Sequence, residues 1–152
     1  MVVSPMKNDL LERMSHLWHF PIYEILVDEM KADLTPKLLN GILNYLNIKA
    51  GRDLAPCISD DDFDVFYPII QFLMSRGCSY DSATSQATIE SNSLNVMRKM
   101  AALGLRLSKE TKEYLYAIKM NSESEVSEIL ECFGESSLEE FRSFVRSKQS
   151  SR

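Results

Sequence analysis

The chain is poor in the two residues that most often interrupt regular structure. Its 152 residues include only five glycines and five prolines. A fold built from many short strands needs such turn residues at frequent intervals. Their scarcity argues against a many-turned β fold and favours long helical segments.

Cysteine and histidine are also rare. The three cysteines, Cys57, Cys78 and Cys132, are widely separated and form no Cys-x-x-Cys pair. Such a set is no disulfide framework, so we expect packed thiols in a reducing compartment. His16 and His19 stand three residues apart, close enough on a helix to share a metal, but no third ligand is identifiable nearby. We expect both histidines to be structural.

Long apolar runs are missing as well. The first ten residues, MVVSPMKNDL, lack the apolar core of a signal peptide, and no apolar run approaches the length of a membrane span. The formal net charge is −5 and the pI about 5.1, which weighs against nucleic-acid binding. We therefore expect a cytoplasmic protein that binds neither nucleic acid nor membrane.

Motifs for phosphate, a catalytic serine or zinc do not occur in the chain. The nearest candidate is the run Asp60–Asp64, whose alternate carboxylates occupy the first, third and fifth places of an EF-hand loop. Val65 then stands where that loop requires glycine, and Gln71 where it requires glutamate. The run instead suits the start of a helix, with Ser59 or Asp60 as N-cap. We expect no enzyme activity, no cofactor and no metal.

Apolar residues recur at helical spacing along most of the chain. Ser4-Pro5 and Thr35-Pro36 each place a capping residue before a proline, which predicts helix starts there. Because proline is unfavourable inside a helix, we expect a short helix before Tyr67 and a new one over Pro68–Arg76. The other expected helices cover 22–30, 82–91, 94–103, 108–120, the stretch from Ser122 to Gly134, and a last one begun by a capping box of Ser136 and Glu139.

Four of these segments share one pattern. They are PIYEILVDEM from Pro21, PIIQFLMSRG from Pro68, NVMRKMAALG from Asn95 and EVSEILECFG from Glu125. Their sixth column reads Leu26, Leu73, Met100 and Leu130, and their tenth reads Met30, Gly77, Gly104 and Gly134. The spacing suits one helix–turn–helix unit per repeat in the second half. One helical hairpin cannot cover its own apolar face, so such hairpins stack and share a core.

The second helix of each unit resembles the outer helix of ankyrin repeats, whose pattern is roughly V-V-x-L-L-L-x-x-G. Residues 114–134, YLYAIKMNSESEVSEILECFG, are similar to that family in the distance from the first helix to the terminal glycine. The family's Thr-Pro-Leu-His start is missing, and the period is a few residues short. The resemblance covers residues 77–134 and, less fully, 21–50. Another α-solenoid or an irregular helical bundle is the alternative.

The expected fold is therefore one all-α domain of stacked helical hairpins, an ankyrin-like α-solenoid. Its expected parts are N-terminal helices over 1–50, a connector over 51–59, repeat hairpins over 60–134, a capping helix over 135–147 and a frayed tail over 148–152.

In α-solenoids the first helices and the turns before them line a concave side, where exposed Tyr and Arg favour binding. The candidate partner-binding residues on that surface are Tyr80, Arg106, Lys109, Lys112, Tyr116 and Lys119. Tyr116 either faces away from the core or packs in the stack with Tyr114. A second candidate surface is the acidic stripe of Glu125, Glu128, Glu131 and Glu135, where the alignment also sets Arg98 beside Glu128.

The sequence thus predicts a non-enzymatic module that binds another protein as an adaptor, inhibitor or effector. A structural homo-oligomer and an enzyme with an unrecognised site are the alternatives.

Overall fold

The structure, a computed structural model, describes residues 20–150, which form helices and turns and contain no strand. The predicted all-α class is confirmed for this part of the chain. The expected helix from Ser4 and the pair His16 and His19 lie outside the described residues. The elements are α2 (Phe20–Glu24), the π-helix η2 (Ile25–Glu29), α3 (Pro36–Arg52), α4 (Asp60–Ser75), α5 (Ser82–Glu90), α6 (Leu94–Ala102), α7 (Lys109–Ile118), α8 (Glu123–Cys132) and α9 (Glu139–Ser150).

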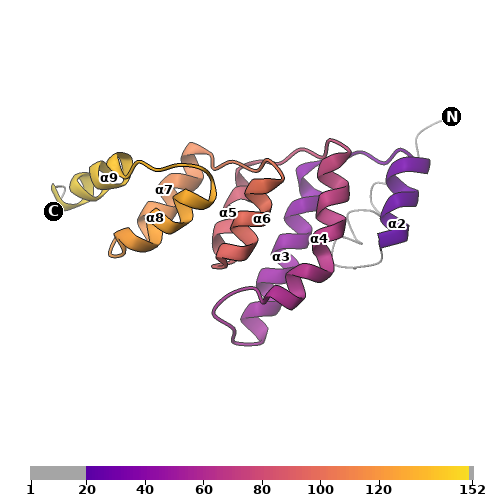
Figure 1. The fold of residues 1–152 in the computed structure, drawn as a ribbon, viewed down its shortest axis with the longest axis horizontal. Helices are drawn as coiled ribbons and strands as arrows, with labels where there is room; N and C mark the ends of the chain where they lie inside the picture. Colours follow the sequence, from indigo (N-terminus) through magenta and orange to yellow (C-terminus); the bar gives the residue numbers. More distant parts are fainter. Residues whose placement is uncertain (1–19, 151–152) are drawn as a thin grey trace.

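The helices lie in two rows that follow the chain from one end of the elongated molecule to the other (Figure 1). In one row α3 contacts α5, α5 contacts α7 and α7 contacts α9. In the other row α4 contacts α6 and α6 contacts α8, while α2 packs on α4. The buried apolar side chains form one cluster that runs from Tyr23 to Phe141 between the rows.

Small polar side chains let the middle of the first row pack closely. The buried residues of α5 include Thr84, Ser85 and Thr88, which are at most 1% exposed. Each hydroxyl has a hydrogen-bond partner: Thr88 Oγ1 donates to the Thr84 carbonyl within the helix, and Ser85 Oγ donates to the Arg106 carbonyl, both at 2.9 Å. Asn47 of α3 donates to the Ala87 carbonyl at 3.0 Å. Polar groups can therefore be buried here because each has a hydrogen-bond partner.

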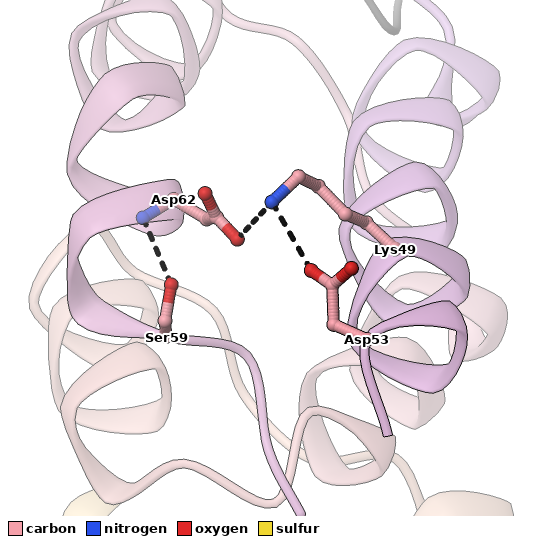
Figure 2. A network of polar contacts seen from close by, with 4 residues as sticks. All are labelled: Lys49, Asp53, Ser59 and Asp62. Carbon is pink, nitrogen blue, oxygen red and sulfur yellow. Dashed lines mark hydrogen bonds and ion pairs between the residues drawn. The ribbon is translucent and has the colours of Figure 1, made fainter. Parts of the chain in front are cut away.

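Helices α3 and α4 are longer than the helices that follow. They span 17 and 16 residues, whereas α5 to α8 span 9 or 10. Polar contacts join the C-terminal end of α3 to the N-terminal end of α4. Lys49 on α3 contacts Asp62 at 2.7 Å and Asp53 at 3.4 Å, and Ser59 accepts a hydrogen bond from the Asp62 amide (Figure 2). The capping interpretation is thus confirmed for Ser59.

The expected break at Pro68 is wrong, because α4 continues through it as one helix. Pro68 is exposed. The carbonyl of Asp64, four residues earlier, loses its helical partner because proline has no N–H. Water can reach this exposed side of the helix, so the lost hydrogen bond can be replaced.

Helices α4, α6 and α8 end in the same way. Gly77, Gly104 and Gly134 have positive φ of 89°, 106° and 76°. The amide after each glycine donates back to the carbonyl of the aligned sixth-column residue, Leu73, Met100 or Leu130, at 3.0, 3.1 and 2.9 Å. This is the Schellman arrangement, which favours glycine because its φ is positive.

The first aligned segment, which begins at Pro21, ends in a similar turn that contains one additional residue. After the π-helix η2, the Ala32 amide donates to the Leu26 carbonyl at 2.9 Å, and Lys31 takes the positive φ of 55°. A π-turn accommodates one extra residue in a helix. The residue that corresponds to the glycines is therefore Lys31, and the alignment of Met30 with them is wrong.

Three other boundaries differ from expectation. Gly51 and Arg52 end α3 rather than open the connector. The last helix begins at Glu139, whose amide donates to Ser137 Oγ at 3.3 Å, so the capping box of Ser136 and Glu139 is not formed. Lys148 to Ser150, expected to be frayed, continue α9.

Candidate functional site

A surface groove of about 730 Å³ lies between α7 and α9, and we call it the α7–α9 groove. It contains three of the six predicted partner-binding residues, which come from α7. The other lining residues come mainly from α9. The lining residues are Lys109, Lys112, Glu113, Tyr116, Glu139, Glu140, Ser143, Phe144 and Ser147.

The position of α9 in the first row creates this groove. Helices α5, α7 and α9 each begin five residues after the glycine that ends the preceding helix, at Gly77, Gly104 and Gly134. Helix α9 therefore lies beside α7 as α7 lies beside α5. The sequence interpretation assigned this segment only a capping role and so missed Glu139, Glu140 and Phe144. The glycine-to-helix spacing was the signal that could have found them.

Aromatic side chains form the floor of the groove. Tyr116 is only 4% exposed, so the packed position is correct and the outward one is wrong. Its ring lies 5.6 Å from Phe141 and 5.8 Å from Phe144, measured between centroids, in tilted pairs. Such aromatic pairs add to the stabilisation from buried area. Tyr116 therefore fastens α9 to α7, and Phe144 keeps part of its ring accessible at the groove.

The floor is electronegative around the Tyr116 hydroxyl. That hydroxyl donates to Glu140 Oε2 at 3.4 Å, at the outer limit of a hydrogen bond. Burial raises the pKa of Tyr116 to about 12, and the negative charges of Glu140 and Glu135 add to this. Both effects disfavour loss of the proton from the phenol, so the Tyr116 hydroxyl remains a neutral donor.

At the rim of the groove, carboxylates without an ion-pair partner outnumber lysines without one. Lys112 is already engaged in an ion pair with Glu135. Within residues 20–150, no lysine or arginine lies within ion-pair distance of Glu113, Glu139 or Glu140, and no carboxylate within that distance of Lys109. Lys148, whose ammonium lies over the Phe144 ring, is a second cation beside Lys109, and Arg142 attracts Glu139. The groove thus carries a small excess of negative charge.

The other three predicted residues lie elsewhere. Tyr80 is 37% exposed and its hydroxyl donates to the Gly104 carbonyl at 3.4 Å. Arg106 donates to the carbonyls of Ala101 and Leu105 at 3.0 and 2.8 Å, so its guanidinium is used within the fold. Lys119 forms an ion pair with Glu125 at 3.1 Å.

Lys119 and Glu125 line a separate hollow of about 230 Å³ with residues of α6 and α8. Glu128 lines this hollow too and also borders a second one with Glu131, Arg98 and Cys132. Glu135 lies beside Lys112. The stripe therefore borders two adjoining hollows and one ion pair.

The carboxylates of the acidic run point to different helices. Asp62 contacts Lys49 of α3, while Asp64 contacts Lys99 of α6 at 2.8 Å. Asp60 accepts a hydrogen bond from Asn95 at 3.0 Å. Their divergence favours a role in fastening α4 to its neighbours. In the described part of the chain, no group of three His, Cys, Asp or Glu side chains is placed to hold a metal ion.

The cysteines differ in burial. Cys78 is 6% exposed, its thiol lies 3.5 Å from the Thr35 carbonyl, and burial raises its pKa to about 11. Cys57 and Cys132 are half-buried, so the expectation that all three thiols are packed holds fully only for Cys78. Burial also raises the pKa of Cys132.

No helix within residues 20–150 combines the length and the apolar character that crossing a bilayer requires. Comparison with known protein families, with curated proteins and with solved structures found no match to this chain.

Proposed function

We propose that this chain is a non-enzymatic protein–protein interaction module that presents the α7–α9 groove to a protein partner. The observation that carries the proposal is the groove itself, which combines an aromatic floor of Tyr116 and Phe144 with charged side chains on its rim. Binding surfaces commonly place aromatic anchors at the centre and polar groups around them.

The proposed architecture is an ankyrin-like α-solenoid. Two observations support it: the two rows of helices (Figure 1) and the shared Schellman ends of α4, α6 and α8. In such a stack each hairpin is held by its neighbours, so the groove walls are already ordered before a partner arrives. A preordered surface loses little conformational entropy on binding.

The test is affinity capture from a lysate of cells in which the chain occurs naturally. The groove variant replaces Glu113 and Glu139 by lysine. A matched control replaces Glu128 and Glu131 of α8 by lysine, which changes the net charge equally on a different surface. All four residues are exposed, so both variants should keep the circular dichroism of the wild type.

A protein retained by the wild type and the control but lost from the groove variant would support the proposal. Retention of the same protein by all three baits would place the binding surface elsewhere. If the wild type retains no protein, the interaction-module proposal itself is wrong.

Self-association is a second candidate, favoured by a separate apolar hollow of about 330 Å³ between α3 and α4. It is lined by Tyr45, Leu46, Val65 and Phe66, beside the ion pair shown in Figure 2. Val65 and nearby Ile48 of α3 are 48% and 55% exposed. Sedimentation over a range of concentrations tests this candidate, because a dimer formed there should dissociate when Val65 is replaced by lysine.

A further inference from the structure

We infer that the α7–α9 groove accepts a basic amphipathic helix, which inserts an apolar side chain against Phe144 and places lysine or arginine beside Glu139 and Glu140. This inference rests on the proposed function and adds the chemistry of the partner. It follows from the balance of charges in the groove, the accessible aromatic ring and the size of the opening.

The charge balance favours a cationic partner by a small margin. The lysine deepest in the groove, Lys112, is already neutralised by Glu135, which leaves Glu113, Glu139 and Glu140 against Lys109 and against Lys148, whose ammonium lies over the Phe144 ring. Arg142 also attracts Glu139, although its ion pair is with Glu123. Glu139 and Glu140 lie in the first turn of α9, where the helix dipole stabilises them as anions.

The aromatic floor can receive the apolar anchor of such a helix. The ammonium of Lys148 lies 5.4 Å from the centroid of the Phe144 ring, so the protein itself covers part of this ring with a cation and leaves the rest to an apolar contact. Phe144 is half-buried, so an apolar side chain can also cover its remaining accessible surface. Long basic side chains can lie along an apolar surface and keep their charge at the rim.

The length of the groove suits about two turns of a helix. Its lining runs from Lys109 to Tyr116 on α7 and from Glu139 to Ser147 on α9, roughly 11–12 Å at the usual helical rise. An amphipathic helix laid in a groove typically anchors through side chains at i, i+3, i+4 and i+7. The net charge of −5 would also steer a basic segment toward the protein.

The experiment measures fluorescence anisotropy with two synthetic helical peptides. One carries leucine at the anchor positions and lysine on the flanking positions, and the other has glutamate in place of every lysine. Each is titrated with wild-type protein, with Glu139→Gln/Glu140→Gln and with the control Glu128→Gln/Glu131→Gln. Glutamine keeps an acceptor for the Tyr116 hydroxyl, and both variants change the net charge equally.

We expect the lysine peptide to bind wild type and control alike, and the groove variant about two- to thirty-fold more weakly, as the loss of two exposed charge pairs implies. Equal weakening in groove variant and control would show attraction by net charge alone and overturn the inference. Preference for the glutamate peptide, or no binding of either peptide, would also overturn it. The capture experiment above decides separately whether the chain binds a protein.

Discussion

The two ends of the described structure are stabilised by different means. At the α3–α4 end, the largest fully buried side chains, such as Tyr23, Phe63 and Leu39, lie within residues 23–73. At the α7–α9 end, the last helix buries only Phe141 completely and is otherwise held by half-buried side chains and charged contacts. The comparison indicates that the first end supplies stability and that the second is free to carry a polar surface.

The largest expected effect comes from removing one buried phenylalanine side chain at each end of the structure. Phe63→Ala should lower the free energy of unfolding by about 3–5 kcal/mol, because Phe63 is 0% exposed and the cavity cannot collapse fully. Phe141→Ala should release α9 and leave the rest of the fold stable, because α9 contacts the molecule mainly through α7. Urea denaturation and amide hydrogen exchange measure the two outcomes. Global unfolding of both variants at the same urea concentration would show that the ends form one cooperative unit.

Replacing either of two glycines by alanine should change the stability by an intermediate amount, in opposite directions for the two sites. Gly104→Ala should destabilise the protein by about 1–2 kcal/mol, because φ is 106° and side chains rarely adopt it. Gly51→Ala should stabilise the protein by about 0.5–1 kcal/mol, because Gly51 lies in α3 and an added Cβ meets no atom within 4 Å. Thermal unfolding of both variants beside wild type gives the signs. Equal destabilisation by both would contradict the helical assignment of Gly51.

A smaller effect is expected from acid. The Arg76 guanidinium lowers the pKa of Asp28, the Lys49 ammonium that of Asp62, and the Asn40 amide that of Asp81. A lowered folded pKa means that the stabilisation is present above the unfolded value near 3.8 and is lost as pH falls below it. All three contacts lie in the first half of the described chain.

The urea concentration at the unfolding midpoint of the wild type should be lower at pH 3 than at pH 6. These two values roughly bracket the pKa of a carboxyl group. The midpoint should fall less for Asp62→Asn, which already lacks one of these groups, than for the control Asp61→Asn, whose carboxylate is exposed. An identical pH response of the two variants would count against the Lys49–Asp62 contact (Figure 2).

The smallest effect concerns reactivity rather than stability. Cys78 should react with iodoacetamide far more slowly than Cys57 at pH 8, because it is 6% exposed and its pKa is about 11. Mass spectrometry of peptides over time gives the order. Reaction of Cys78 at the rate of Cys57 would show that the contact between Cys78 and the turn at Thr35 opens readily.

Much of the fold could be predicted from the sequence because its determinants are local. Ser59, Ser93 and Ser108 cap the helices that follow them, and each accepts a hydrogen bond from an amide three residues later. The glycines that end α4, α6 and α8 were visible in the pattern. The break at Pro68 was predicted wrongly. The rule against proline inside a helix considers only the local chain, whereas Pro68 is tolerated because the fold leaves it on an exposed side of α4.

The candidate site was predicted only in part. Lys109, Lys112 and Tyr116 were selected from their position on a first helix, and the structure places them together in the groove. Arg106 and Lys119 were selected by the same rule but lie outside the groove, where they contact neighbouring carbonyls and Glu125. Charge and exposure of a single residue do not show which neighbour it contacts, so the rule could not separate the two groups.

The sequence by itself determined the helical class, most helix ends and the buried faces, because periodicity, caps and glycine ends act within a few residues of the chain. Only the tertiary structure decided that α9 packs beside α7, that Tyr116 is buried under Phe141 and Phe144, and that Glu139 and Glu140 line the same groove as Lys109. Those outcomes depend on side chains about 24 positions apart in the sequence, such as Tyr116 and Glu140, whose contact no local pattern encodes.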